Sequence, residues 1–356
     1  MKKIAVIGGG AAGISAAIEA ALLGARVTVF EHMEEPLKKL LLTGNGRCNF
    51  SNDDVSEEHY HGCSEIIRSV CEKVTCDDIL DFMADTLGVE ALSVHYRFGG
   101  EGYFYPSTNR AETVRNAMLD KCRKLNVKIV TGCTVSEVRP NGSQIDIFLQ
   151  GCEIPYGFSG LIFACGSNSH PETGSDSSIY GVLKSLSVPF KTFRPALTSV
   201  KSKDAVLKEL RGIRADGEAL LINETTGETF ASPFGEIQFN EHSVSGIPVM
   251  QLSRYAGLSE DPFLLKLKIS KVNNKKDVKY PFEICLKVSG TGGFKECQCC
   301  TGGVPGEAVD PETLMYRKIP GICFAGEMLD VDGDCGGYNL HFAIASGLIA
   351  ARSVIK

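Results

Sequence analysis

Three glycines near the start of the chain, Gly8, Gly10 and Gly13, have the spacing of a turn that binds pyrophosphate. They follow a short apolar run and open an alanine-rich stretch. In a strand–turn–helix unit the first glycine allows the turn, the second lets the backbone approach a phosphate, and the third lets the helix pack on the strand. Ala11 and Ala12 lie in the same turn, so we count them with the glycines as candidate cofactor-binding residues.

The residues that follow supply the context that a lone glycine motif lacks. The sequence predicts a helix over 11–23, ended by Gly24, and a second strand over 25–30. Glu31 directly follows this strand, eighteen residues after Gly13. A carboxylate at that place bonds ribose hydroxyls in dinucleotide-binding folds. The sequence therefore predicts a bound dinucleotide.

Three further segments, 44–49, 164–166 and 326–339, place glycines at the end of a strand or the start of a helix. A doubly wound sheet brings its strand ends together at one edge, where ligands bind. One dinucleotide-binding motif combined with several distant ligand-binding loops suits a long, extended ligand that needs contacts at both of its ends. We therefore predict FAD rather than NAD. No second fingerprint is complete, because 289–293 lacks the following helix and acid. Any NAD(P)H would therefore dock transiently over the flavin, without a domain of its own.

The start of the last predicted helix, 337–354, is a second candidate ligand contact. Gly336 and Gly337 precede Tyr338, Asn339 and Leu340. A helix begins with unpaired backbone N–H groups and a partial positive charge, which would stabilise negative charge on a reduced flavin. An ordinary helix that starts with glycine and packs on the sheet explains the same residues, and both interpretations stay open.

The remaining pattern divides the chain into a nucleotide domain and an insert. Apolar periodicity predicts helices at 64–87, 108–125 and 179–186, and a hairpin at 92–105 with Gly99, Gly100 and Gly102 as turn residues. From about residue 194 to 298 helical periodicity fades and β-runs dominate. The predicted domains are 1–193, the first part of the FAD-binding domain, 194–298, a β-rich substrate domain, and 299–356, the returning part of the FAD-binding domain.

Composition limits the classes of partner. The chain has 356 residues and a net charge of −6, which argues against a nucleic-acid partner. No apolar run approaches the roughly 18 residues of a membrane span. The chain begins without the charged and apolar regions of a signal peptide, and its fourteen cysteines are mostly scattered. We therefore expect a cytoplasmic protein with free thiols that acts on a small molecule, and the sequence does not indicate its oligomeric state.

Other residues that could do chemistry lack the spacing that the chemistry needs. Cys48 has no partner at position 53, which is Asp, so a redox disulfide of the C-x4-C type is not expected. The cluster 297–300 lacks a second ligand pair for zinc. His341 is a candidate only, because a helical histidine more often packs than reacts. Asp330, Asp332 and Asp334 alternate without the later glutamate of a calcium loop.

Several of these motifs together resemble the BaiN-type flavoproteins. This bacterial family is labelled NAD(P)/FAD-dependent oxidoreductase and includes aminoacetone oxidase. The similarity covers nearly the whole chain. Its most specific parts are the GRCN loop, residues 46–49, and the GGYNL segment, residues 336–340. The segments that carry it are 8–13, 39–49, 105–107, 164–166, 171–175, 194–197, 300–304 and 324–340.

The resemblance implies an α/β fold, with a Rossmann-like FAD-binding domain of glutathione-reductase-like topology and an inserted, barrel-like β domain. It implies Glu31 on the adenosine ribose and Val135 near the adenine. It also implies 43–49 and 337–340 around the ribitol and isoalloxazine, with Glu327 on ribitol or pyrophosphate. Candidate cofactor-binding residues beyond those already named are Lys39, Thr43, Gly44, Gly46, Arg47, Cys48, Asn49, Ala164, Cys165, Gly166, Gly326 and Glu327.

The chain departs from this family at three places. Residues 270–296 are too short for the helical excursion that is usual in the family. His341 replaces the usual Gln after GGYNL, and residues 241–247 differ from the family's usual FTHxGLSGP-like sequence. No catalytic residue and no metal ligand is therefore assigned. We predict a FAD-dependent oxidoreductase that transfers hydride at flavin N5 on a small organic substrate. We expect NAD(P)H to reduce the flavin, and the alternatives are a flavin-dependent amine or alcohol oxidase that uses oxygen and a non-catalytic flavin-binding redox sensor.

Overall fold

The computed structural model describes residues 1–95, 102–232, 234–258, 260–274 and 282–356. They form two compact units, each with its own hydrophobic core. The first unit contains 1–167, 172–192 and 302–356, and the second contains 168–171 and 193–301. The predicted turn residues Gly99 and Gly100 lie outside the described residues, whereas Gly102 begins a strand.

A parallel sheet forms the centre of the first unit. Its strand order is β21-β11-β1-β2-β7, and every neighbouring pair is parallel. These strands read as short apolar runs because a parallel sheet is covered on both faces. The arrangement confirms the predicted Rossmann-like α/β fold. The strands are β1 (Lys3–Ile7), β2 (Arg26–Phe30), β7 (Lys128–Val130), β11 (Gly160–Phe163) and β21 (Ile322–Phe324).

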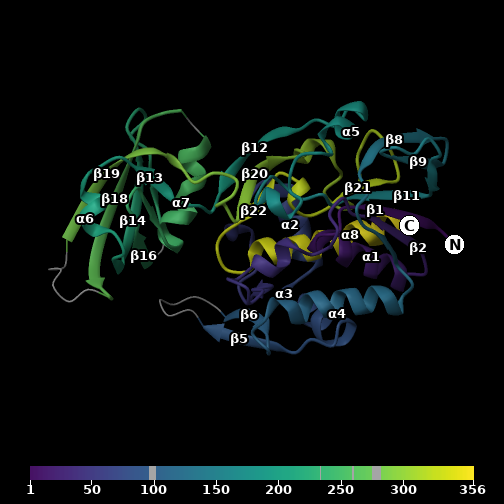
Figure 1. The fold of residues 1–356 in the computed structure, drawn as a ribbon, viewed down its shortest axis with the longest axis horizontal. Helices are drawn as coiled ribbons and strands as arrows, with labels where there is room; N and C mark the ends of the chain where they lie inside the picture. The colour runs from purple at the N-terminus through teal and green to yellow at the C-terminus, as the bar shows by residue number, and fades with distance from the viewer. Residues whose placement is uncertain (96–101, 233, 259, 275–281) are drawn as a thin grey trace. The chain divides into compact units, whose positions relative to one another are not determined.

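Two helices from opposite ends of the chain, α1 (Ala11–Leu22) and α8 (Tyr338–Ile355), lie side by side in Figure 1. Glycine allows their close approach, since a Cβ on Gly347 would collide with the Ala12 carbonyl oxygen. A Cβ on Gly326 would likewise meet the Ala12 side chain. Helix rise then places the start of α8, nine residues before Gly347, roughly 14 Å from this contact.

Smaller elements surround this core. The predicted helix over 64–87 is interrupted, because Thr75 caps a new helix with its side chain and Asp78 completes a capping box. The elements are β3 (Ser51–Asn52), β4 (Tyr60–Gly62), α2 (Ser64–Lys73), α3 (Cys76–Asp81), a π-helical turn (Phe82–Thr86), β5 (Ala91–His95), β6 (Gly102–Pro106), α4 (Ala111–Lys124), β8 (Val135–Asn141), β9 (Gln144–Leu149), β10 (Tyr156–Phe158), α5 (Tyr180–Ser185) and β22 (Val331–Gly333). Single 3₁₀ turns occur at Lys39–Leu42, Glu57–His59, Pro171–Thr173, Gly306–Ala308 and Gly326–Met328.

The second unit is a closed β-barrel, as the fold class predicted. Its sheet runs β15-β14-β16-β17-β13-β19-β18, and an additional β14–β18 pairing closes the ring. The strands are β13 (Val200–Ser202), β14 (Arg214–Asn223), β15 (Thr229–Ala231), β16 (Gly235–Phe239), β17 (Ser243–Ser245), β18 (Phe263–Val272) and β19 (Phe282–Thr291).

The β-runs expected from about residue 194 to 298 form this barrel, and the same region also contains two helices that the sequence did not indicate. Helix α6 spans Val206–Leu210, and α7 spans Ile247–Leu258 and buries Val249 and Leu252. Strands β12 (Lys191–Ala196) and β20 (Cys299–Gly303) pair where the chain passes between the two units. Among the described residues, every helix is too short or too polar to cross a lipid bilayer.

The close packing of α8 on α1 can be tested with two helical glycines. Gly347→Ala should lower the free energy of unfolding by about 1–3 kcal/mol, because the new methyl group overpacks a buried contact. Gly181→Ala in α5, where a Cβ meets nothing within 4 Å, should be neutral or slightly stabilising. Denaturant unfolding followed by circular dichroism measures both. Equal destabilisation by the two changes would contradict the packing described here.

Candidate active site

The turn between β1 and α1 has the geometry that the glycine motif predicts. Gly8 has φ +103°, and a Cβ there would collide with the Ala164 carbonyl oxygen. A Cβ on Gly13 would collide with the Gly8 carbonyl oxygen. Gly10 differs from both, because nothing lies within 4 Å of a Cβ at that position. Gly8 and Gly13 are thus required by the fold, whereas Gly10 faces open space.

The start of α1 keeps its positive end available. Gly10 is the N-cap residue, no side chain caps the helix, and its first turn contains no acidic residue. The first helical bond runs from the Ile14 N–H to the Gly10 carbonyl. The N–H groups of Ala11, Ala12 and Gly13 therefore precede the helical ladder, as at every helix start. This end of the helix is suited to an anion.

Glu31 lies beside the glycine turn at the end of β2. Its Oε2 accepts a hydrogen bond from the Gly9 N–H at 2.6 Å, and its Oε1 accepts one from the Met33 N–H at 2.8 Å. The side chain is buried. A carboxylate has about four lone-pair sites, so two more donors can be accepted there. The Cys133 N–H donates to the Glu31 carbonyl at 3.1 Å. Strand β8 begins two residues later, at Val135, so its start lies close to Glu31 along the chain.

Lys39 and Glu327 form an ion pair between the turn after β2 and the segment after β21. A Cβ on Gly166 would lie 4.0 Å from Lys39 Nζ, so three distant segments meet at this pair. Glu327 Oε1 is buried and has no hydrogen-bond partner among the residues that the structure describes. This acceptor suits a hydroxyl-bearing ligand. Directly after β11, the Ala164 N–H donates a hydrogen bond to the Ile7 carbonyl. The Cys165 thiol donates to the same Ile7 carbonyl.

Residues 43–49 form a compact loop. The Thr43 carbonyl accepts bonds from the Gly46 and Cys48 N–H groups at 3.1 and 2.9 Å. The Arg47 guanidinium lies over the Tyr105 ring at 4.6 Å. Gly44 is closely packed, since a Cβ there would lie 2.7 Å from the Asn49 nitrogen. The loop therefore packs against β6 through Arg47 and Tyr105.

Asn49 joins this loop to the start of α8. The Asn49 side-chain amide is oriented so that both its nitrogen and its oxygen form hydrogen bonds. Its nitrogen donates to the Ser51 and Phe104 carbonyls at 3.0 and 3.1 Å. Its oxygen then accepts the Gly337 N–H at 3.2 Å. Gly337 has φ +98°, and a Cβ there would lie 2.5 Å from the Ser51 carbonyl oxygen. The two segments singled out in the sequence as GRCN and GGYNL thus meet in space.

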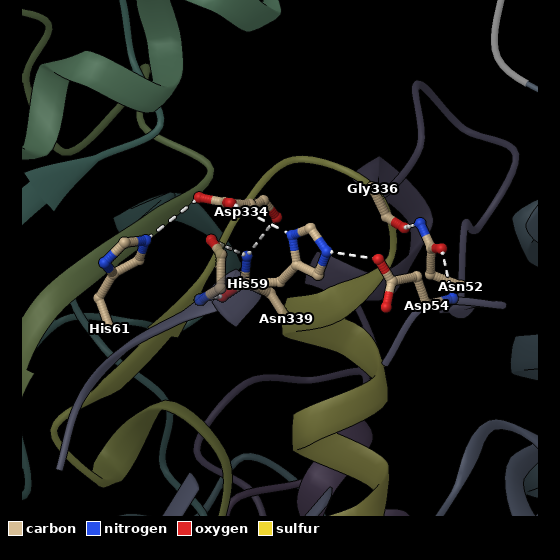
Figure 2. Close-up of polar contacts among 8 residues, drawn as sticks. Asn52, Asp54, His59, His61, Asp334, Gly336 and Asn339 are labelled. Carbon is tan, nitrogen blue, oxygen red and sulfur yellow. Dashed lines mark hydrogen bonds and ion pairs between the residues drawn. The ribbon is translucent and has the colours of Figure 1, made fainter. Parts of the chain in front are cut away.

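The α8 start is also uncapped by side chains and has no acid in its first turn. Asn339 instead holds the preceding loop, accepting the Gly333 N–H at 2.8 Å and donating to the Gly333 carbonyl at 2.9 Å. The Tyr338 carbonyl accepts a bond from the Tyr60 hydroxyl, and Leu340 is buried. Figure 2 shows Asn339 pointing from α8 towards this loop.

Sequence reasoning missed a cluster of four side chains beside α8. His59 lies between Asp54 and Asp334, and His61 contacts the same Asp334 carboxylate (Figure 2). In the sequence, Asp334 stands out only as part of an alternating acidic run. The pairs that His59 and His61 make with Asp334 join parts of the chain more than 270 residues apart, so local spacing gave no signal for them, whereas Asp54 and His59 are five residues apart.

Two residues that could have been reactive are buried in unreactive forms. Burial raises the pKa of the Cys48 thiol to about 12, so it stays protonated at neutral pH. Burial also lowers the pKa of His341 to about 4. His341 lies between the Ser51 hydroxyl at 2.9 Å and the Val74 carbonyl at 3.1 Å. Because the carbonyl can only accept, Nε2 carries the proton and Nδ1 accepts from Ser51. None of the fourteen cysteines, all of which the structure describes, forms a disulfide.

The comparison with known families decides the identity of this fold. A family model described as HI0933-like protein Rossmann domain matches residues 2–353. The chain belongs to the HI0933-like family. This confirms the resemblance to BaiN-type flavoproteins seen in the sequence motifs.

The HI0933-like chain also matches characterised proteins over their full length. It is 31% identical over 419 residues to the 3-dehydro-bile acid delta(4,6)-reductase of Clostridium scindens, covering 100% of both chains. It is 24% identical to the ribosomal RNA dihydrouridine synthase of Haemophilus influenzae, covering 99% of this chain and 98% of that protein. The first alignment is longer than the present chain, so that relative contains insertions.

Solved structures show the same fold. The 3-ketosteroid-delta4-(5alpha)-dehydrogenase of Rhodococcus jostii RHA1 matches with a TM-score of 0.61 and 16% identity, over 100% of this chain and 97% of that one. The 3-ketosteroid delta1-dehydrogenase of Sterolibacterium denitrificans matches with a TM-score of 0.58 and 9% identity, over 99% of each chain. Together with the family and the 31% identity to a reductase over the whole chain, this makes the HI0933-like protein a FAD-dependent oxidoreductase.

His341 generates a prediction about acid stability. A buried neutral histidine stabilises the fold above its unfolded pKa of about 6.5, and this contribution falls by up to about 3 kcal/mol as the pH drops towards 4. His341→Gln keeps one donor and one acceptor, so it should remove this part of the acid sensitivity. Denaturant unfolding of both proteins at several pH values between about 4 and 7 measures the difference. Parallel stability curves would contradict a neutral, buried His341.

Proposed function

We propose that this protein is a FAD-dependent reductase of a conjugated carbon–carbon double bond in a steroid-like small molecule. The observation that carries the proposal is the full-length similarity to a bile acid reductase, at 31% identity. Bound FAD would accept a hydride from NAD(P)H and deliver it from N5 to the substrate. Saturation of one double bond consumes that hydride and one proton. The substrate class and NAD(P)H are part of this proposal.

The residues of the first unit fit the nucleotide half of FAD. The open space at Gly10 and the uncapped start of α1 suit the pyrophosphate, for which Ala11, Ala12 and Gly13 offer backbone N–H groups. Glu31 would accept the adenosine ribose hydroxyls, since its carboxylate has acceptor sites left after the two backbone bonds. Val135 would lie near the adenine.

The flavin half would be held by the segments that meet at Asn49. Residues 43–49 and 337–340 would surround the ribitol and isoalloxazine, and Lys39 with Glu327 would contact ribitol or pyrophosphate. The partner-less Oε1 of Glu327 suits a ribitol hydroxyl. The positive end of α8 would stabilise negative charge at the end of the ligand that lies against it. The roughly 14 Å between the α1–α8 contact and the start of α8 suits an extended cofactor.

A small-molecule substrate is favoured over RNA, although one relative is a ribosomal RNA dihydrouridine synthase. The net charge of −6 is opposite in sign to what phosphate contacts require. Two alternatives predicted from the sequence, an amine or alcohol oxidase and a flavin redox sensor, give different results in the experiments below.

Gly10→Val tests the cofactor site without disturbing the fold. The valine side chain would enter the space assigned to the pyrophosphate, so FAD affinity should fall by at least about tenfold, with a smaller loss for Gly10→Ala. The melting temperature of the apoprotein should stay close to wild type, because a Cβ there meets no protein atom within 4 Å. Flavin fluorescence measures the affinity. Unchanged FAD binding by Gly10→Val would place the pyrophosphate elsewhere.

Anaerobic stopped-flow absorbance tests the reaction. NADH or NADPH alone should bleach the bound flavin, and a 4,6-dien-3-one steroid should restore its colour. A benzylamine or alcohol panel, oxygen and ribosomal RNA are the comparison substrates. Bleaching only by an amine or alcohol, followed by reoxidation with oxygen, would indicate an oxidase. A reduced flavin that reacts with no acceptor but changes the oligomeric state would indicate a sensor.

A further inference from the structure

The loop 333–337, which leads into α8, is held by the segment 52–62. Strands β4 and β22 pair in an antiparallel ladder, with Asp332 opposite His61. The Asn52 side chain donates to the Gly336 carbonyl at 2.9 Å. The Asp334 N–H donates to the His59 carbonyl at 2.8 Å. The conformation of the α8 start therefore depends on a segment far away in the sequence.

His59 makes the side-chain part of this contact (Figure 2). Its Nε2 lies 2.9 Å from Asp54 Oδ2, and its Nδ1 lies 3.6 Å from Asp334 Oδ2. Its ring is stacked on Tyr338, with centroids 4.5 Å apart and planes 17° apart. His61 contacts the other Asp334 oxygen at 3.3 Å. One imidazole thus contacts the loop, the first residue of α8 and the segment after β3.

This arrangement differs from an ordinary surface ion pair. Exposed pairs contribute little because water screens them and both side chains are mobile. The His59 side chain is only 28% exposed, and stacking fixes its ring. The Asp334 carboxylate is the main cause that raises the pKa of His59, and Asp54 adds to it against the opposing effect of burial. The charged form of the ring is therefore favoured between two carboxylates.

We propose that His59 is a positioning residue that holds loop 333–337 and Tyr338 so that the α8 start presents its N–H groups to FAD. This inference rests on the proposed function, because it takes the α8 start as the flavin-facing end of the site. His59 acts through Asp334 and Tyr338 and is not assigned a contact with the cofactor.

A pH dependence follows from the charge. The titratable groups facing His59 are Asp54 after β3, Asp334 after β22 and Tyr338 on α8, and His61 on β4 shares Asp334. Since the pKa of His59 is raised, the contact is fully formed at low pH and is lost as the pH rises through that raised value. FAD affinity should fall over the same range.

The test is the FAD dissociation constant of the full-length protein, measured by flavin fluorescence from about pH 5.5 to 8.5. His59→Gln and His59→Phe should weaken FAD binding by about tenfold at low pH and remove the pH dependence, because each loses the charged contact. His59→Phe keeps the ring stack, so it separates stacking from charge. His61→Gln is the matched control and should stay within about threefold of wild type with the same pH slope.

Wild-type affinity and slope in both His59 variants would overturn the positioning role. If neither variant folds, Asp54→Asn removes one carboxylate and should shift the fall in affinity to lower pH, and an unshifted profile would overturn the inference. Wild-type protein that binds no FAD at any pH would instead refute the proposed function, and the inference with it. The wild-type titration thus separates the two failures.

Discussion

The close approach of α8 to α1 is the constraint on which the rest of the first unit depends. Gly347 lets the last helix of the chain pass directly over the Ala12 carbonyl, and Gly13 lets the first helix lie against the β1 turn. A side chain at either glycine would push apart elements that have to share one edge of the sheet. This close packing brings together two helices whose starts are more than 300 residues apart in sequence, as the proposed FAD site requires.

Both helix starts lack side-chain caps and first-turn acids, so neither is neutralised by its own sequence. The carboxylates nearby are held in place and keep acceptor sites: Glu31 accepts two backbone N–H groups, and Glu327 pairs with Lys39 through Oε2 while its buried Oε1 has no partner among the described residues. Positive helix ends suit the pyrophosphate of a ligand, and the remaining acceptor sites of these acids suit its hydroxyl groups. This electrostatic pattern agrees with the FAD-dependent family to which the chain belongs.

The sequence predicted those parts of the structure that short-range physics determines. The turn with Gly8, Gly10 and Gly13 is local, and so is the helix start at Gly337, and both appear as expected. Barrel closure depends on the non-local β14–β18 pairing, which no window of sequence contains, and it was expected only from the family resemblance. Helix α7 was missed because its apolar positions follow Pro248 in a region of β-runs. His59 and Asp334 were missed because their contact joins two distant segments.

Hydrogen exchange with and without FAD tests most directly whether one ligand spans both helix starts. The structure predicts that FAD slows exchange of the backbone N–H groups at 8–13 and at 336–341 in the same titration, with a common dissociation constant. Residues of the barrel strand β14 provide an internal reference in the second unit. Protection confined to 8–13, with the start of α8 unchanged, would contradict the account, because the cofactor would then be held at its nucleotide end alone.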